Sequence, residues 1–201
     1  GSLARSEATE PAGSLDARAR AAFGAGRYGE AGELAAQLVA QLESAGADDL
    51  ALASALELLA NTHGERGASA SAAPLHARAL ALRERTLGHD HPDVARSLNN
   101  LAEALRAEGQ LDEAEPLYRR ALAIWEAKLG PGHPDVATVL GNYALLLQQR
   151  EQLDRARDLL ERSLRIREEA FGPDHLAVAI SLNNLGMLAR ARGDDEGAEL
   201  L

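Results

Sequence analysis

Apolar residues along this chain recur at helical spacing, and the groups that they form recur in turn. Each group occupies positions i, i+3, i+4 and i+7, which make one face of an amphipathic helix. The groups return every 42 residues (98 − 56 = 42, 140 − 98 = 42) at Leu56, Leu59, Ala60 and His63; Leu98, Leu101, Ala102 and Leu105; Leu140, Tyr143, Ala144 and Leu147; and Leu182, Leu185, Gly186 and Ala189. A fixed period of this length is the signature of a repeat protein. His63, the polar member, is expected to be half-buried with its hydrogen bonds satisfied.

A second helix is predicted in each period, after a break at Gly67, Gly109 or Gly193, with Glu151 replacing the glycine once. The apolar face of this helix recurs as Ala114, Leu117, Tyr118, Ala121, Leu122 and Ile124, and as Ala156, Leu159, Leu160, Ser163, Leu164 and Ile166. Asp112 and Asp154 are predicted N-caps, with Glu115 completing a capping box. Gly88, Gly130 and Gly172 are expected to end these helices as C′ residues. Each period is therefore a helical hairpin, and stacked hairpins share one core.

The domain organisation follows from the period. Residues 1–12 are small and polar, start with a Gly1-Ser2 pair that resembles a tag scar, and are expected to form a disordered tail. Residues 13–201 are predicted to form a single solenoid with units at 13–47, 48–90, 91–132, 133–174 and a truncated 175–201. The first unit is degenerate. The prediction is an all-α fold of nine complete helices and the start of a tenth.

The hairpins resemble tetratricopeptide repeats. Leu98, Leu101, Ala102 and Leu105, followed by Ala114, Tyr118 and Ala121, match the family's pattern position for position. The family's usual period is about 34 residues, whereas HEAT and armadillo repeats run to about 40–47, so these remain the alternative fold. The phrase HPDVA…SLNNLA…EAE.LYRRAL is similar to the kinesin light chain subclass, whose units are longer. The resemblance implies a right-handed α-solenoid of about four and a half hairpins.

Composition narrows the possible functions. Hydrophobic residues make up 46% of the chain but aromatic residues only 3%, so alanine and leucine supply the apolar mass and favour helix. The net charge of −10 and the pI near 5.1 argue against binding to nucleic acid or an anionic membrane. The chain has no cysteine, and no apolar run reaches the length of a membrane span. We expect a cytoplasmic protein, and the predominance of arginine among the basic residues suggests a bacterial source.

Catalytic and metal sites are not predicted. His91, His133 and His175 recur once per unit, but equivalent positions on successive hairpins are too far apart to bind one zinc ion. The favoured interpretation is a residue at the start of a helix, before proline in two cases. The chain has no glycine-rich phosphate loop and no HExxH or GxSxG motif. We therefore expect no enzyme activity and no cofactor.

The candidate binding residues lie on the first helices, opposite the apolar stripe. The resemblance implies that first helices line a concave groove and that asparagine there binds the backbone of an extended peptide. The predicted peptide-binding residues are Asn100, Asn142, Asn184, Asn99, Asn183, Arg96, Arg106, Gln148, Arg190 and Asn61. The alternative for the asparagines is a hydrogen bond to a neighbouring helix. The arginines suggest an acidic partner, although Asp16, Glu57 and Glu103 lie among the basic residues.

Two further expectations concern Trp125 and the end of the chain. Trp125 occupies the position of Arg83 and Arg167, which we expect to be exposed, so it either packs at the edge of the core or contacts a partner. The truncated last unit should leave an apolar patch of Leu182, Leu185 and Leu188 that could form a homodimer. The predicted function is a non-enzymatic protein–protein interaction module. The alternative is a self-assembly or regulatory scaffold arm of a larger multidomain protein.

Overall fold

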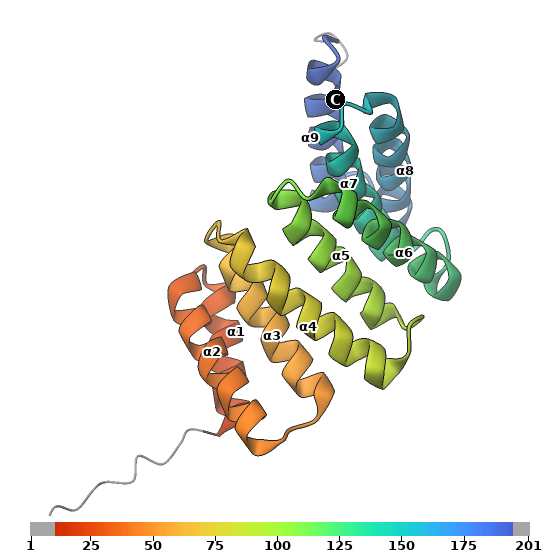
Figure 1. The fold of residues 1–201 in the computed structure, drawn as a ribbon. Helices are drawn as coiled ribbons and strands as arrows, with labels where there is room; N and C mark the ends of the chain where they lie inside the picture. Colours follow the sequence, from red (N-terminus) through yellow and green to blue (C-terminus); the bar gives the residue numbers. More distant parts are fainter. Residues whose placement is uncertain (1–10, 195–201) are drawn as a thin grey trace, which may run out of the picture. The chain divides into compact units, whose positions relative to one another are not determined.

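The computed structural model describes residues 11–194, which form nine α-helices and no strand (Figure 1). The helices are α1 (Ala12–Gly24), α2 (Tyr28–Ala45), α3 (Asp49–Glu65), α4 (Ser69–Leu87), α5 (Pro92–Ala107), α6 (Leu111–Leu129), α7 (Pro134–Gln149), α8 (Leu153–Phe171) and α9 (Leu176–Ala191). The all-α fold and the nine complete helices are thus confirmed. The predicted tenth helix and most of the predicted tail fall outside the described residues.

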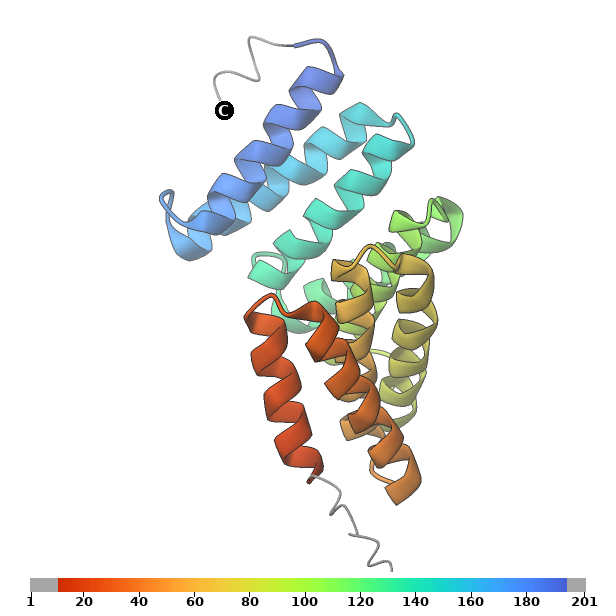
Figure 2. The same ribbon diagram turned by 90° about the vertical axis from the view of Figure 1, so that its left-hand side faces the viewer.

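The chain divides into two compact units, Gly1–Thr86 and Leu87–Leu201. Helices α1 to α4 belong to the first unit, called unit 1 below, and α5 to α9 belong to the second, unit 2. Within unit 2, α7, α8 and α9 lie side by side in Figure 2. A single continuous solenoid stays a prediction.

The core of unit 1 is built from small and branched side chains of α1, α2 and α3. Leu15, Leu38 and Leu56 are at most 4% exposed, and Ala19 and Ala35 are fully buried. The small residues allow helices to approach closely, since a bulkier side chain would separate them. At Gly32 on α2, for instance, a Cβ atom would lie only 3.1 Å from Thr62 Oγ1 on α3.

The core of unit 2 follows the predicted stripes. Leu98 on α5, Tyr118 on α6, Leu140 on α7 and Leu160 on α8 are fully buried. Of the predicted apolar patch on α9, Leu188 is 1% exposed, Leu185 is 7% exposed and Leu182 is half-buried. Leu185 and Leu188 also line an open pocket of about 340 Å³, together with Leu164.

The three recurrent histidines start the first helices of unit 2. The Nδ1 atoms of His91, His133 and His175 accept hydrogen bonds from the backbone N–H two residues on, at 3.1, 3.2 and 3.1 Å. Each histidine is thus an N-cap, a position whose acceptor satisfies an otherwise unpaired helix N–H. The prediction that these residues start helices is confirmed, and an Nδ1 used in this way is not available as a metal ligand.

The predicted N-caps of the second helices are wrong. Helices α6 and α8 begin two residues earlier than expected, after Gln110 and Gln152, and neither cap side chain makes a capping hydrogen bond. Asp112 and Asp154 therefore lie inside the first turn. Asp112 pairs with Arg150, and Asp154 accepts a hydrogen bond from Arg192 Nη1 at 2.6 Å. These pairs join each second helix to the next first helix, a contact between repeats that a local capping rule does not include.

The capping box at Glu115 is wrong for the same reason. Glu115 is 7% exposed, and its Oε1 atom accepts a hydrogen bond from Tyr143 Oη at 2.7 Å. Arg150 Nη1 lies 2.9 Å from Glu115 Oε2, so the carboxylate joins α6 to α7. The glutamate faces the following repeat instead of the start of its own helix.

The turn between α7 and α8 departs from the glycine rule. Gly67, Gly109 and Gly193 take the left-handed conformation with φ of 73°, 78° and 78°, and Glu151 takes it with φ of 59°. Glycine accepts this conformation without a clash of Cβ, whereas glutamate does not. The turn geometry is therefore retained at Glu151 at a cost in stability.

Candidate binding face on the first helices

The predicted asparagines of α5 and α7 contact one another. Asn142 Nδ2 donates to Asn99 Oδ1 at 3.1 Å, and Asn99 Nδ2 lies 3.4 Å from Asn100 Oδ1. Asn99 is only 6% exposed, whereas Asn100 and Asn142 are half-buried. The alternative of a bond to a neighbouring helix is thus observed for Asn142 with Asn99. The remaining surface of Asn100 and Asn142 is what a ligand could reach.

The asparagines of α9 are more open. Asn184 is half-buried, in the same repeat position as Asn100 and Asn142, and Asn183 is exposed with its Nδ2 atom 3.6 Å from Met187 Sδ. Of the other predicted residues, Gln148 on α7 and Asn61 on α3 are half-buried. Asn61 belongs to unit 1 and is therefore described separately from the others.

Two arginines of the face are paired with acids of their own helix. Arg106 binds Glu103 through Nε at 3.2 Å and through Nη2 at 2.6 Å, and Tyr118 Oη donates to Glu103 Oε2 at 2.9 Å. Burial lowers the pKa of Arg106, but the hydrogen bond and charge of Glu103 outweigh it, and the pKa is raised. Arg96 pairs with Asp93 at 2.9 Å. The charge that would attract an acidic ligand is therefore largely neutralised at these two positions.

Exposed apolar residues lie on α9, and the predicted site set omitted them. Among residues 11–194 the exposed large hydrophobic side chains are Phe171 at the end of α8 and Leu176, Ile180 and Met187 on α9. Leu176, Ile180 and Met187 form one stripe, because residues four and eleven apart on a helix share a face. The repeat equivalents of Ile180 and Met187 on α5 are the charged Arg96 and Glu103. Comparing equivalent positions in successive repeats could have identified this change.

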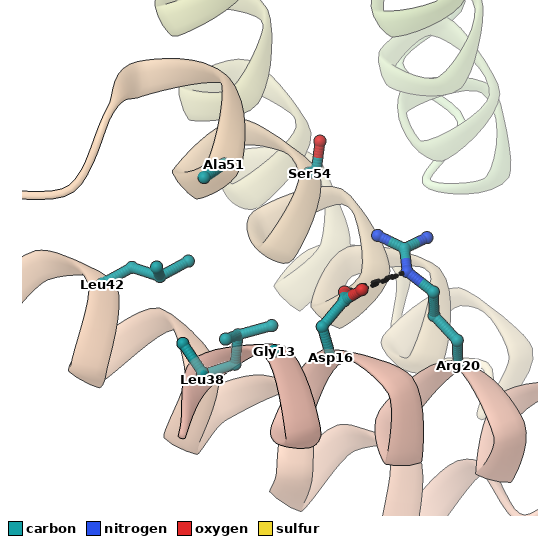
Figure 3. Close-up of a pocket in the computed structure, with 8 residues that line it drawn as sticks. Gly13, Asp16, Arg20, Leu38, Leu42, Ala51 and Ser54 are labelled. Carbon is teal, nitrogen blue, oxygen red and sulfur yellow. Dashed lines mark hydrogen bonds and ion pairs between the residues drawn. The ribbon is translucent and has the colours of Figure 1, made fainter.

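Unit 1 carries a pocket on the corresponding face. It has a volume of about 230 Å³ and is lined by Ala12, Gly13, Asp16, Arg20, Leu38, Leu42, Ala51 and Ser54 (Figure 3). Arg20 Nε donates to both carboxylate oxygens of Asp16 at 2.9 Å. The hydrogen bond from Arg20 to Asp16 raises the pKa of the arginine against the effect of burial. Its lining residues come from the first three turns of α1, the second half of α2 and the first two turns of α3.

Trp125 packs at the edge of the core, as predicted, and is 4% exposed. Its Nε1 atom donates to the carbonyl oxygen of Pro92 at 3.1 Å. The expectation that this repeat position is exposed is wrong. Arg83 is 3% exposed and donates to Glu57 at 2.7 Å, and Arg167 donates to Ser181 Oγ at 2.8 Å. Long side chains at this position fold back onto a first helix, so charge alone does not place them in solvent.

Neither a metal centre nor a membrane span is found among the described residues. No group of three or more histidine, aspartate or glutamate side chains in residues 11–194 is arranged to hold a metal ion. None of the helices in the same residues is long and apolar enough to cross a bilayer. The first-helix face of unit 2 consists of amides, the ion pairs of Arg96 and Arg106, the exposed Arg190 and apolar side chains, which suit recognition of a polypeptide.

Repeated helical hairpins with small residues at the helix contacts define an α-solenoid of the tetratricopeptide type. The tetratricopeptide repeat model matches residues 70–127, 93–169 and 135–201. The chain therefore belongs to the tetratricopeptide repeat family. No curated protein matches the sequence.

Solved structures of kinesin light chain-like proteins are similar to this chain. The crystal structure of BtubC (BKLC) from P. vanneervenii is 25% identical, with a TM-score of 0.77 over 92% of this chain and 74% of that one. A putative kinesin light chain from Podosopora anserina with nearly identical TPR-like repeats is 26% identical, with a TM-score of 0.76 over 96% and 92%. RapI, at 14% identity and a TM-score of 0.78 over 94% and 66%, shares the fold. The predicted subclass is thus confirmed.

Proposed function

We propose that this protein is a non-enzymatic interaction module in the cytoplasm, whose first-helix face binds an extended segment of a partner protein. Tetratricopeptide repeats indicate a protein-interaction module. The finer proposal rests on one observation: Asn100, Asn142 and Asn184 recur in the same repeat position on α5, α7 and α9, and all three stay half-buried. An amide side chain both donates and accepts, so a row of them suits the alternating groups of an extended backbone.

The charges of the face define the partner less narrowly than the sequence suggested. Arg190 is exposed, whereas Arg96 and Arg106 are paired with Asp93 and Glu103. Any preference for acidic side chains should then come mainly from Arg190 and should weaken with salt, because exposed charges are screened. Backbone recognition by the asparagines carries the proposal.

The test starts with a peptide array that supplies a binding peptide. Calorimetry then compares the protein with the double variant Asn100→Ala and Asn142→Ala, and with Arg165→Ala on the exposed surface of α8 as the matched control. Losing one or two net hydrogen bonds should weaken binding by about tenfold. If the double variant retains the affinity and the fold of the unchanged protein, the asparagine row is not the site.

A second candidate is self-assembly, alone or as a scaffold arm of a larger multidomain protein. Phe171, Leu176, Ile180 and Met187 favour it, since the exposed large hydrophobics of residues 11–194 gather at α8 and α9. Light scattering should then detect a homodimer that Leu176→Glu with Ile180→Glu dissociates and Arg165→Glu does not. A protein that stays monomeric at high concentration would exclude the homodimer.

A further inference from the structure

The pocket of unit 1 exists because two positions carry smaller side chains than their repeat equivalents. Leu42 occupies the repeat position at which the following repeats have Arg83, Trp125 and Arg167. Gly13 stands where they have Ser54, Arg96 and Thr138, and a Cβ atom added at Gly13 would meet nothing within 4 Å. The pocket therefore lies at a place in the first repeat where the following repeats carry a larger side chain.

Trp125 shows what can fill the corresponding place in unit 2. Its indole is 4% exposed and reaches the start of α5, where Nε1 donates to the carbonyl oxygen of Pro92. The first hairpin, α1 with α2, thus lacks the large side chain that Trp125 supplies in the third hairpin.

The chemistry of the pocket favours an apolar occupant. Leu38, Leu42 and Ala51 supply its apolar surface, and the polar groups at the rim already have partners. Asp16 is neutralised by Arg20, and Ser54 Oγ donates to the carbonyl oxygen of Leu50 at 2.9 Å (Figure 3). A charged side chain would lose hydration without gaining an unpaired partner, whereas an apolar one gains burial.

We infer that this pocket takes one large apolar side chain of a partner segment that lies along the first helices. The inference rests on the proposed function, because it names an anchor residue for the same kind of ligand. The neutral rim matches an uncharged side chain, and the volume of about 230 Å³ leaves room for one such group.

The chain has no cysteine, so a single engineered thiol can report on the pocket. Ser54→Cys is equilibrated with equal concentrations of bis(3-methylbutyl) disulfide and bis(2-hydroxyethyl) disulfide in excess 2-mercaptoethanol. The protein thiolate attacks one sulfur of the reagent, forms a mixed disulfide and releases the other half as a thiolate, so no net oxidation is needed. Intact-protein mass spectrometry measures the ratio of the two adducts.

Thr138→Cys is the matched control. Thr138 has the same repeat position on α7, and its Oγ1 atom donates to the carbonyl oxygen four residues earlier, at 3.2 Å, as Ser54 does. Next to Thr138, the repeat position that corresponds to Leu42 is occupied by Trp125. We expect the branched alkyl adduct to be favoured at least about tenfold more at Ser54→Cys than at Thr138→Cys, since each buried methylene favours it several-fold.

Two further variants test whether the size of the side chain at the position of Leu42 and Trp125 causes the preference for the branched alkyl adduct. Adding Leu42→Trp to Ser54→Cys should fill the pocket and abolish the preference. Adding Trp125→Leu to Thr138→Cys should open the equivalent pocket and create a preference, with circular dichroism confirming that the helices remain. An equal adduct ratio at Ser54→Cys and Thr138→Cys overturns the inference.

Other occupants give different results, and each also overturns it. A preference that disappears as protein concentration rises indicates a second copy in the pocket. Low yields of both adducts at Ser54→Cys, with normal yields at Thr138→Cys, indicate that another part of the chain covers it. The experiment uses no partner peptide, so its failure leaves the calorimetric test of the asparagine row unaffected.

Discussion

The pair of Glu115 and Tyr143 should be energetically coupled, because it joins α6 to α7 inside unit 2. Tyr143 is 5% exposed, and its hydroxyl donates to a carboxylate whose side chain is 9% exposed. Burial raises the pKa of Glu115, but the hydrogen bond from Tyr143 and the charges of Arg119, Arg150 and Arg155 outweigh it, and the pKa is lowered. The structure therefore holds the glutamate ionised.

The size of the coupling energy follows from the hydrogen-bond partners that each substitution removes. Tyr143→Phe removes the hydrogen bond to the Glu115 carboxylate, and with it the bonds that the hydroxyl accepts from Arg119 and Arg155 at 3.2 Å, and should cost about 2 kcal/mol. Glu115→Ala removes the bond that Tyr143 donates, leaves the hydroxyl hydrogen without its acceptor and separates Arg150 from its buried partner, for about 3 kcal/mol. The double variant should also cost about 3 kcal/mol, which gives a coupling energy of about 2 kcal/mol.

Urea unfolding that is monitored by tryptophan fluorescence measures these free energies for unit 2. Trp125 is the single tryptophan and belongs to unit 2, so its emission reports the unfolding of that unit. Arg119→Ala is the control: Arg119 contacts both Glu115 and the Tyr143 hydroxyl, but its side chain is 59% exposed, and such exposed contacts contribute little. Costs that add within about 0.5 kcal/mol in the double variant would refute the coupling.

Two further predictions concern the turn at Glu151 and the buried His76. Glu151→Gly should stabilise unit 2 by about 1 kcal/mol in the same fluorescence assay, since it relieves a left-handed non-glycine residue, whereas Gly109→Ala should destabilise it. Burial lowers the pKa of His76 to about 4, with Glu57 opposing and Arg83 assisting the shift. Because the unfolded state then binds the proton more readily, the stabilisation is complete above about pH 6.5 and is lost as the pH falls towards 4. Circular dichroism in urea should show a loss of about 2 kcal/mol between pH 7.5 and 5 that His76→Gln reduces; an unchanged slope would contradict the prediction.

The period predicted the parts of the fold that depend on local patterns. Apolar spacing is enough to place nine helices, because it reports which face of each helix is buried. The histidine caps were also predictable, since a residue before Pro92 or Pro134 must stand at the start of a helix. Both features need only neighbours in the sequence.

Contacts between repeats were not predictable in the same way. Aspartate is a residue type that often caps helices, so the local sequence predicts Asp112 as an N-cap. Its actual partner, Arg150 at the end of the next first helix, is evident only from the structure. Arg83 and Arg167 have the charge of surface residues, yet their stems cross to a first helix and their head groups bond there. In each case the deciding atom is about 10–40 residues away, beyond the range of a capping or polarity rule.

The bond between Asn142 and Asn99 also constrains the proposed ligand. Asn142 Nδ2 donates one of its two N–H groups to Asn99 Oδ1 at 3.1 Å. The side chain therefore keeps its carbonyl oxygen as an acceptor and one N–H as a donor, so an extended segment can present both a backbone N–H and a backbone carbonyl group to it. The contact between the helices thus fixes the direction of the amide before a ligand binds, which reduces the ordering cost of recognition. The same contact makes Asn142 a structural residue as well as a candidate binding residue, so the affinity of any Asn142 variant must be interpreted together with its unfolding free energy.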